Sequence, residues 1–444
     1  MARWIPFLSV CSGLLAAGAM GTTACAADWP QWLGPNRDSV WPETGITRTL
    51  PKKDAAIKWR TPIAGGYAGP AVARGRVYVT DYVRTAGEAF NNPGRRARLQ
   101  GNERVLCLSA ETGEILWKHE YHCPYEISYP AGPRATPTVD GDRVYTLGAE
   151  GHLFCFDAQT GRVLWSKQLR DEYKTRTPIW GFSAHPLVDG DTLFCVVGGK
   201  GSVAVAFNKY TGQERWRALS AREPGYCAPA LITAGGRKQL LIWHVESLNS
   251  LDPKTGKLFW SVPLRPSYGM SIIPPLRYGD YLFASGIGPV AVLLRLDPNK
   301  PAVRELWRGK PKTALYSATC APIINDGVIY GATCRRGSLV AARLETGERL
   351  WETFQPTTGS RRASYGTVFI VKNQDRFFLF SETGDLILAK LTPEKYEELD
   401  RLHVLEPTGE AFGRSVVWSH PAFANKCMFA RNDKEIVCVS LAAD

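Results

Sequence analysis

The sequence predicts an all-β protein, an eight-bladed β-propeller whose blades are four-stranded antiparallel sheets. Three observations support this prediction. A nine-residue phrase recurs along the 444-residue chain, short strands separated by turn residues surround each copy, and the two ends of the chain hold complementary parts of one repeat. A fixed internal period of this kind is characteristic of repeat architectures, in which each unit is one supersecondary structure.

The recurring phrase contains Thr-Gly and ends in Trp, four residues after the Gly. It occurs intact at residues 109–117, 157–165, 208–216, 252–260 and 343–351. A flat indole at the end of an outer strand can fill the wedge between two blades while its N–H bonds to a backbone acceptor of the neighbouring blade. We therefore expect seven tryptophans, from intact and degenerate copies, to dock one blade on the next: Trp59, Trp117, Trp165, Trp216, Trp260, Trp307 and Trp351.

Each unit follows one plan, which residues 135–165 contain in full. An apolar strand that holds a Pro is followed by an Asp-Gly turn and then by a strand of β-branched and aromatic residues, 143–147. A second Gly turn leads to a third strand, 151–156, and the Thr-Gly phrase turns the chain into a fourth strand that ends at Trp165. Gly and Asp tolerate the positive φ of tight hairpins, so the four short strands predict one antiparallel sheet.

The strands that open each unit set the number of blades. Eight such strands begin at Pro70, Pro137, Pro186, Pro229, Pro275, Pro322, Gly366 and Pro421. Residues 57–444 then provide about 48 residues per unit, close to the length of a four-stranded blade. The last unit contains three strands, and residues 57–63 read as its missing fourth. Joining the two ends closes the ring and removes the long free edges of an open sheet.

The first 27 residues differ from the rest of the chain. One arginine is their only charge, and an apolar stretch precedes a run of small residues. This pattern predicts a signal peptide over residues 1–27, cleaved near Ala26 or Ala27, and hence a periplasmic or secreted protein. A lipoprotein acylated at Cys25 is the less favoured alternative, because the residues before Cys25 match a lipobox poorly.

The mature chain is expected to have two parts. An extended lead-in, residues 28–56, is rich in Pro and Trp and should lie across the body of the propeller, residues 57–444. No later stretch holds the roughly 18 consecutive apolar residues of a spanning helix. We therefore expect no transmembrane segment, while peripheral contact with a membrane stays open.

Basic residues are spread along the chain, which has a formal net charge of +12. One dense cluster, Arg95, Arg96, Arg98 and Arg104, lies in the segment 84–104. We interpret this segment as a solvated loop of a basic protein; contact with an acidic surface such as lipid head groups or polysaccharide is the alternative. Export argues against a nucleic-acid partner.

The cysteines favour core packing over metal binding. Repeat alignment places Cys107, Cys155 and Cys438 at the position that Ala206, Ser250 and Ala341 fill in other units, and Cys195 at the position of Thr146. Such residues are expected to be small and buried. No cysteine pair has Cys-x-x-Cys spacing, so no metal site is predicted. Nine cysteines follow the signal, and this odd number leaves disulfide pairing open.

Candidate ligand-binding residues lie in the loops that precede each Pro-led strand, at one mouth of the central channel. Converging aromatic rings with a few cationic or titratable groups suit a flat anionic ring or a sugar. Alternatively, these side chains pack the loops and plug the channel mouth. The candidates are Arg134, Trp180, His185, Tyr226, Tyr268, Tyr316, Arg414, Trp418 and His420, and the same loops carry Tyr67, Tyr129, Arg361 and Tyr365.

Two of these candidates are histidines that open inner strands. His185 and His420 belong to the third and eighth units, so they should share a ring without being neighbours. Shared metal ligation is therefore not expected, and a general-base role for either histidine stays open.

The phrase Ala/Cys-x-Asp-x-x-Thr-Gly-x-x-x-Trp resembles the tryptophan docking repeat of the PQQ-like (pyrrolo-quinoline quinone) β-propeller superfamily. The resemblance covers the chain after residue 57. It implies the propeller fold and is less informative about activity. The superfamily includes quinoprotein alcohol and glucose dehydrogenases and also non-enzymatic scaffolds similar to the outer-membrane assembly protein BamB.

The chain departs from the enzymes of that superfamily. The enzymes carry adjacent cysteines against the quinone and a carboxylate and amide set for Ca²⁺, whereas this sequence has no adjacent cysteines. Acidic residues near the channel loops match none of the family's catalytic motifs, so no catalytic residue is assigned: Glu126, Asp171, Glu172, Glu223 and Glu410.

The sequence therefore predicts an exported binding or assembly scaffold for a protein or glycan partner, with no cofactor expected. The alternative is a PQQ-dependent oxidoreductase acting on alcohols or sugars, with PQQ and calcium on the aromatic loops. Ca²⁺ takes six to eight oxygen ligands, so the shortage of carboxylates in these loops is the feature that separates the two hypotheses.

Overall fold

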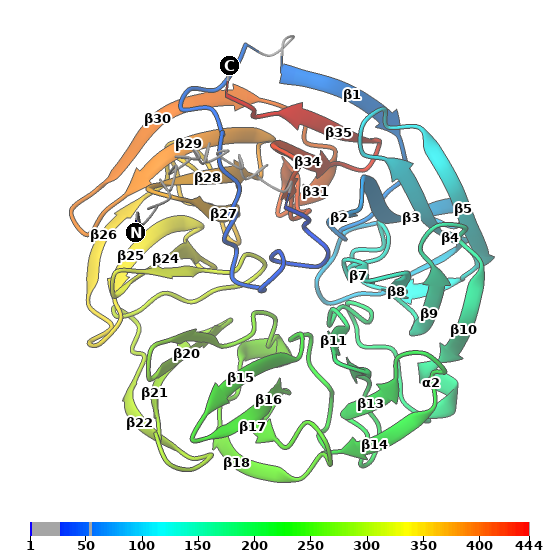
Figure 1. The fold of residues 1–444 in the computed structure, drawn as a ribbon, viewed down its shortest axis with the longest axis horizontal. Helices are drawn as coiled ribbons and strands as arrows, with labels where there is room; N and C mark the ends of the chain where they lie inside the picture. The colour runs from blue at the N-terminus through cyan, green and yellow to red at the C-terminus, as the bar shows by residue number, and fades with distance from the viewer. Residues whose placement is uncertain (2–26, 53–55, 444) are drawn as a thin grey trace.

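The chain is built as a ring of β-sheets. The computed structural model describes residue 1, residues 27–52 and residues 56–443. Eight sheets follow one another around a central axis, and each contains a row of four antiparallel strands (Figure 1). The predicted fold class and number of blades are therefore confirmed. The predicted signal peptide, including Cys25, lies outside the described residues apart from its two ends.

The first four blades occupy residues 71–263. Blade 1 contains β2 (Ala71–Ala73), β3 (Arg76–Ala86), β4 (Ala97–Ser109) and β5 (Ile115–His122), with β6 (Tyr125–Ile127) also paired to β4. Blade 2 contains β7 (Thr138–Asp140), β8 (Arg143–Leu147), β9 (His152–Asp157) and β10 (Val163–Gln168), followed by the short helix α2 (Leu169–Glu172). Blade 3 contains β11 (Leu187–Asp189), β12 (Thr192–Val196), β13 (Ala204–Asn208) and β14 (Glu214–Ala218). Blade 4 contains β15 (Ala230–Ala234), β16 (Arg237–Trp243), β17 (Ser247–Leu251) and β18 (Leu258–Pro263).

The remaining blades complete the circle. The 3-10 turn η1 (Ser267–Gly269) precedes blade 5, which contains β19 (Leu276–Tyr278), β20 (Tyr281–Gly286), β21 (Val290–Leu296) and β22 (Val303–Arg308). Blade 6 contains β23 (Ile323–Asn325), β24 (Val328–Thr333), β25 (Ser338–Arg343) and β26 (Arg349–Thr353). Blade 7 contains β27 (Val368–Asn373), β28 (Arg376–Ser381), β29 (Asp385–Leu391) and β30 (Tyr396–His403). A separate hairpin, β31 (Gly409–Ala411) and β32 (Arg414–Val416), leads to blade 8.

Blade 8 is closed by the start of the chain. It contains β33 (Ala422–Ala424), β34 (Cys427–Arg431) and β35 (Glu435–Ser440), and β1 (Ile57–Pro62) pairs antiparallel with β35 as its outer strand. The register sets Trp59 opposite Cys438. The predicted closure of the ring by the N-terminal strand is therefore confirmed.

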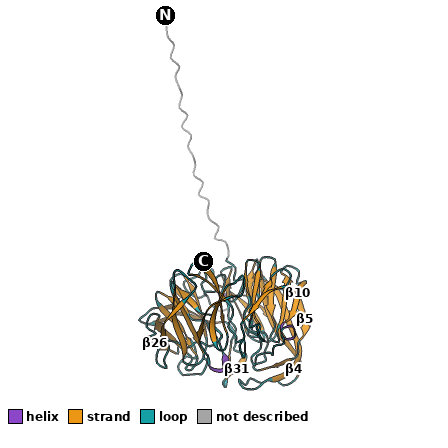
Figure 2. Cartoon of the chain, turned by 90° about the horizontal axis from the view of Figure 1, so that it is seen from below, coloured by secondary structure: helices purple, strands orange, loops and turns teal. Residues whose placement is uncertain are grey.

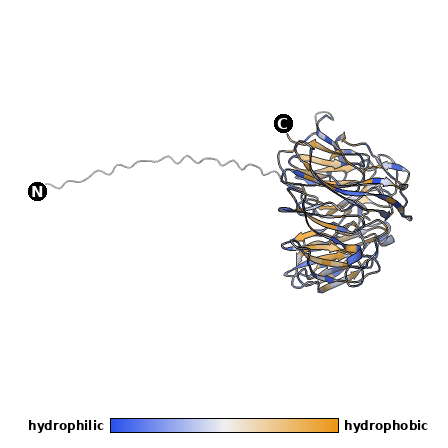
Figure 3. Cartoon of the chain, turned by 90° about the vertical axis from the view of Figure 1, so that its right-hand side faces the viewer, coloured by the Kyte–Doolittle hydropathy of each residue, from blue (hydrophilic) through white to orange (hydrophobic). Residues whose placement is uncertain are grey.

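Burial follows position within the blade. The two middle strands are buried on both faces, as in β24, whose six residues are all buried, because each middle strand is covered by two neighbouring blades. The outer strands alternate between exposed and half-buried residues, as in β5. Apolar residues accordingly concentrate in the strands, with polar residues towards the outside (Figure 3).

The phrase tryptophans lie between blades. The indole N–H of six of them donates to a backbone carbonyl of the next blade at 2.8–3.1 Å: Trp59 to Ala110, Trp117 to Ala158, Trp165 to Lys209, Trp216 to Pro253, Trp307 to Leu344 and Trp351 to Thr392. Trp260 differs, because its N–H donates to the side-chain oxygen of Gln239 in its own blade at 2.9 Å. Gln239 is fully buried, and a buried amide oxygen needs such a donor.

The glycine of each phrase lies under the tryptophan of the preceding blade. A Cβ built on Gly161 would lie 2.6 Å from the Trp117 ring, and Gly161 also has φ of +74°. The same contact recurs for Gly113 with Trp59, Gly212 with Trp165, Gly256 with Trp216 and Gly347 with Trp307. One phrase therefore contributes to two interfaces. Its glycine contacts the tryptophan of the previous blade, and its tryptophan contacts the next blade.

The register accounts for several cysteines. Cys107 and Cys155 lie directly opposite Trp117 and Trp165, and Ala206 occupies the same position opposite Trp216. A small side chain is required there because the tryptophan covers the site. The nine cysteines of the described residues are free and buried.

The lead-in runs through the centre of the ring, where the dark blue segment of Figure 1 crosses it. It forms isolated bridges with three blades, at Val72, Lys372 and Ala442. Arg37 attaches the lead-in to the adjacent blades 3 and 4, because its guanidinium donates to the carbonyl oxygens of Pro186 and, at 3.1 Å, of Pro229. The lead-in therefore occupies the centre of the ring.

The arginine-rich segment 84–104 is largely exposed to solvent, as interpreted from the sequence, but only residues 87–96 form a loop. Residues 84–86 and 97–104 belong to β3 and β4, and the four clustered arginines each contact another group of the protein. Arg104 forms an ion pair with buried Asp81 at 2.5 Å, Arg98 pairs with Glu126, and Arg95 lies over the Phe90 ring. Arg96 donates to the carbonyl oxygens of Glu126 and Thr177.

The glycine contact predicts a stability difference between two variants. Gly141 and Gly161 both have positive φ, but a Cβ on Gly141 meets nothing within 4 Å. Gly141→Ala should therefore cost about 1 kcal/mol through backbone strain alone, whereas Gly161→Ala adds about 1–3 kcal/mol of overpacking against Trp117. Urea denaturation of both variants measures the difference. Equal midpoints would contradict the role assigned to the Gly161–Trp117 contact.

Candidate functional site

A cavity of about 620 Å³ opens at one mouth of the channel. Because consecutive strands run antiparallel, every loop that enters an inner strand emerges at this same end of the ring. The β31–β32 hairpin and the extended β4 lie at this end, on the side of the ring opposite the C-terminus (Figure 2). We call the cavity the aromatic funnel. Its walls include Tyr67, Tyr129, Trp180, Tyr226, Tyr268, Tyr365, Phe369, Phe412 and Trp418.

The structure brings together most of the residues singled out in the sequence. Seven of the nine candidates line the aromatic funnel: Arg134, Trp180, His185, Tyr226, Tyr268, Trp418 and His420. Tyr316 does not, because its hydroxyl donates to the carbonyl oxygen of Lys310 and its ring packs between blades 5 and 6. Arg414 lies behind the wall, where it is paired with Glu382.

The aromatic rings of the funnel contact one another. Trp180 meets Tyr226 edge-on with ring centroids 5.5 Å apart, and Tyr365 stacks on Phe412 at 4.9 Å. Phe412 also lies 6.3 Å from Trp418. Phe412 was missed in the sequence because it comes from the β31–β32 hairpin, which is not part of the repeat. The adjacent Gly413 is a signal of a turn there.

Trp32 of the lead-in forms the floor. Its indole stacks on His185 with centroids 4.2 Å apart and meets His420 edge-on at 6.5 Å. Nδ1 of His185 accepts the backbone N–H of Thr136 at 2.8 Å, so its Nε2 carries the proton. Nδ1 of His420 lies 2.8 Å from the carbonyl oxygen of Pro421 and must donate, which leaves its Nε2 as an acceptor. The two imidazoles thus have opposite hydrogen-bonding roles.

Both histidines are kept neutral. Burial lowers the pKa of His420 to about 4. Burial, followed by the charge of Arg37, lowers the pKa of His185 well below its usual value. Burial likewise lowers the pKa of the Arg37 guanidinium to about 9. A neutral floor suits hydrogen bonding to an uncharged polar group.

Two polar groups of the funnel lack a full set of partners. The Arg134 guanidinium donates to the carbonyl oxygens of Gly132, Ser128 and Tyr129 and lies 5.1 Å from the centre of the Tyr67 ring. Within the described residues it forms no ion pair with a carboxylate, and burial lowers its pKa. The buried hydroxyl of Tyr226 has no hydrogen-bond partner there. A buried group left in this state favours a ligand that completes its bonding.

One carboxylate supports the wall from behind. Glu382 is fully buried and accepts two hydrogen bonds from Arg414, at 2.7 and 3.1 Å. It also accepts the indole N–H of Trp418 at 3.2 Å and the backbone N–H of Thr367 at 3.0 Å. Arg414 and Glu382 therefore orient Trp418 and do not face the cavity.

Comparisons with known proteins agree with this architecture. The fold and the repeated inter-blade tryptophans define a PQQ-like β-propeller. A family profile described as "Outer membrane protein assembly factor BamB" matches residues 101–353 and 244–444. The chain therefore belongs to this BamB-like family of PQQ-repeat propellers.

Individual relatives are distant. A BamB of Yersinia pestis is 22% identical over 200 residues, which are 43% of this chain and 49% of that protein, so the match spans about half the length of the curated relative. The structure resembles BamB from Moraxella catarrhalis, with a TM-score of 0.52 and 16% identity over 86% of this chain and 98% of that one. It also resembles quinohemoprotein alcohol dehydrogenase from Comamonas testosteroni, with a TM-score of 0.57 and 13% identity over 94% of this chain and 81% of that one. These likenesses establish the fold alone.

The funnel does not fit calcium-bound PQQ. Its lining contains no Asp, Glu, Asn or Gln, whereas Ca²⁺ requires six to eight oxygen ligands, mostly carboxylates and carbonyls. None of the acidic residues noted in the sequence lines the funnel: Glu126, Asp171, Glu172, Glu223 and Glu410. Within the described chain, no group of three or more His, Cys, Asp or Glu side chains is placed to hold a metal ion.

No described helix has the length and apolar character needed to cross a membrane.

The neutral floor predicts a pH-dependent stability. His420 has a pKa of about 4 in the fold and about 6.5 unfolded, so the unfolded chain binds more protons between these values. The contribution of neutral His420 to the free energy of unfolding is then fully present above pH 6.5. It is lost as the pH drops towards 4, and the loss amounts to roughly 3 kcal/mol. His420→Asn cannot titrate and should show a smaller loss between pH 7 and 4.5 in thermal unfolding. Exposed His122→Asn is the control, and an unchanged pH profile of His420→Asn would contradict the assignment.

The pair behind Trp418 predicts non-additive energetics. Arg414→Leu leaves Glu382 buried without a counter-ion and should cost about 3–5 kcal/mol. Adding Glu382→Leu removes the orphaned charge, so the double variant should be more stable than Arg414→Leu alone. Chemical denaturation of the two single variants and the double variant measures this coupling. Additive losses would show that the pair does not act as a unit.

Proposed function

We propose that this protein is a non-catalytic binding or assembly module that acts outside the cytoplasm, in the periplasm or after secretion. Its partner is a protein or a glycan that enters the aromatic funnel. Membership of a family described as outer membrane protein assembly factors supports a scaffold role. An assembly factor must bind its partners, and the propeller fold by itself does not imply catalytic activity.

The composition of the funnel carries the proposal. Aromatic walls surround Arg134, whose charge has no carboxylate partner among the described residues, and the unbonded hydroxyl of Tyr226. Concave, mostly apolar sites with a few convergent polar groups are the usual form of a binding site. The lining supplies no carboxylate that could act as a base or hold a metal.

A quinoprotein oxidoreductase remains the second hypothesis, since the fold resembles a quinohemoprotein alcohol dehydrogenase. The lining of the funnel argues against this hypothesis, because it supplies neither the oxygen ligands that Ca²⁺ requires nor a catalytic carboxylate. The purified chain from Asp28 should therefore show no stoichiometric quinone absorbance with PQQ and Ca²⁺. It should also reduce no dye when supplied with alcohols or aldoses. Bound quinone with dye reduction would establish the enzyme instead.

The binding role predicts the behaviour of two funnel variants. Trp180→Ala and Trp418→Ala each remove a ring from the wall, and loss of such an aromatic contact should weaken partner binding about tenfold or more. Partner capture from an envelope extract of the source cells, quantified for each variant, measures the effect. Tyr278→Ala is the control, since Tyr278 is partly exposed and lies outside the funnel. Capture that is unchanged in both tryptophan variants would rule out the funnel as the binding site.

A further inference from the structure

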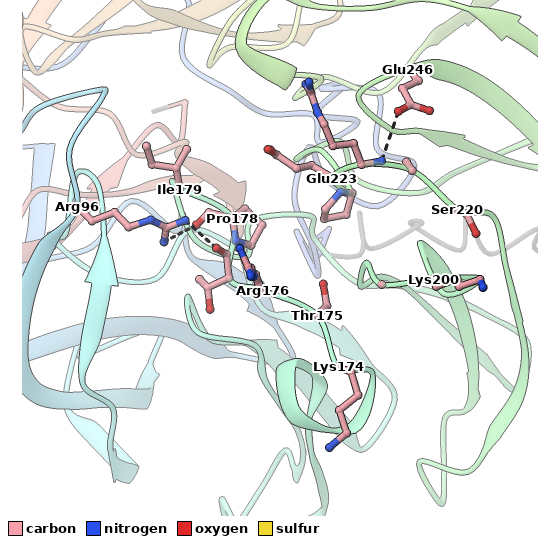
Figure 4. A pocket seen from close by; sticks show the side chains of 15 residues that line it. Arg96, Lys174, Thr175, Arg176, Pro178, Ile179, Lys200, Ser220, Glu223 and Glu246 are labelled. Carbon is pink, nitrogen blue, oxygen red and sulfur yellow. Dashed lines mark hydrogen bonds between the residues drawn. The ribbon is translucent and has the colours of Figure 1, made fainter.

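A second cavity, of about 830 Å³, adjoins the loops of blades 2, 3 and 4 (Figure 4). We call it the basic cleft. Its charged residues are five cations, Arg96, Lys174, Arg176, Lys200 and Arg222, and two anions, Glu223 and Glu246. Cations therefore outnumber anions by more than two to one, and the cleft attracts negative charge.

Four of these cationic side chains have no bonding partner among the described residues. The exposed side chains of Lys174, Arg176, Lys200 and Arg222 form no hydrogen bond or ion pair within the described residues. By contrast, the cleft's Arg96 is bound to backbone carbonyl oxygens. Glu246 accepts only a long bond, 3.4 Å, from the backbone N–H of Arg222. Four like charges around one cavity repel one another, and an anion among them relieves the repulsion.

The basic cleft and the aromatic funnel are neighbours that share their walls. Three short segments contribute to both cavities: residues 93–96, 177–180 and 223–226. In the second segment, Pro178 and Ile179 line the cleft and Trp180 lines the funnel. In the third, Glu223 and Pro224 line the cleft, and Tyr226 lines the funnel. The two cavities therefore lie side by side along the same three segments.

We propose that the two cavities together bind an acidic oligosaccharide, with one sugar ring in the aromatic funnel and its anionic groups along the basic cleft. This inference rests on the proposed function and names the partner's chemical class. Sugar rings present C–H faces that stack on aromatic side chains and hydroxyls that need hydrogen bonds. The funnel supplies both needs, through its aromatic walls and through the hydroxyls of Ser183, Ser364 and Tyr226.

The backbone of the cleft favours a glycan over an acidic peptide. An extended peptide commonly binds by adding a strand to a free sheet edge. The cleft-lining residues 174–179, 199–200 and 220–224 all lie outside strands, so they offer no such edge. Recognition must then come from side chains, and cationic side chains bind carboxylate or sulfate groups on any backbone.

Calorimetric titration of the chain from Asp28 tests the inference directly. The probes are a galacturonic acid hexamer, a heparin-derived hexasaccharide, the neutral methyl ester of the first and hexaglutamate. At least one acidic saccharide should bind more tightly than about 1 mM. For the galacturonate hexamer, esterification should weaken binding about tenfold or more, and added salt should weaken the binding of either acidic saccharide. Binding of neither acidic saccharide, or equal binding of hexaglutamate, would overturn the inference.

Matched variants separate this inference from the proposed function. Lys174→Ala/Lys200→Ala/Arg222→Ala removes three unpartnered cations of the cleft. The control, Lys254→Ala/Lys257→Ala/Lys312→Ala, removes three exposed cations elsewhere. The cleft variant should bind the acidic saccharide about tenfold more weakly, and the control should bind it almost as well as the unmodified protein.

Each pattern of losses has a distinct meaning. A loss in the cleft variant and in Trp180→Ala supports one continuous site. A loss in Trp180→Ala alone would overturn the role of the basic cleft and leave the proposed function in place. A loss in the cleft variant alone would exclude the aromatic funnel from the saccharide site and overturn the inference, whereas the proposed function is decided by partner capture with Trp180→Ala and Trp418→Ala.

Discussion

The structure depends on one repeated contact, an indole ring of one blade lying on a glycine of the next. The contact requires a residue without a Cβ, as at Gly161 beneath Trp117, and a positive φ that turns the chain into its outer strand. The indole N–H then bonds to a carbonyl oxygen of the same turn. Because packing, turn geometry and hydrogen bonding meet at one position, the contact fixes the angle between two blades. It occurs at five of the eight interfaces between blades, and β1 completes the ring against β35.

Closure of the ring determines where a ligand can bind. The antiparallel blades bring every entering loop to one end, so residues distant in the chain become neighbours: Trp32, His185 and His420 form one floor. The lead-in crosses the centre of the ring beside them, with Arg37 bound to the carbonyl oxygens of Pro186 and Pro229 just before two inner strands. The aromatic funnel is therefore a cavity with a floor, and its shape comes from a segment outside the repeat.

The chemistry of the two cavities is consistent with binding. The aromatic funnel has rings, hydroxyls and neutral imidazoles but no carboxylate, and the nearest buried one, Glu382, is occupied by Arg414 and Trp418. The basic cleft next to it carries cations that the fold does not use. An aromatic cavity with a single cation, Arg134, beside a cleft with five cations suits a ligand whose ring and charge are separated along a chain.

The fold, the number of blades and the closure of the ring were predictable from the sequence, because the phrase encodes local turn geometry and a contact with fixed spacing. The sequence also identified ten residues of the funnel, since they occupy equivalent loops. It could not identify Phe412 or Trp32, which come from segments without a period, or separate Arg414 and Tyr316 from the lining, because a loop position does not determine the direction of a side chain. Only the folded structure shows which cations are paired: Arg98 and Arg104 have carboxylate partners, whereas Lys174 and Lys200 line a cleft and have no partner among the described residues. Charge density along a chain does not reveal that difference, because it depends on partners brought together by folding.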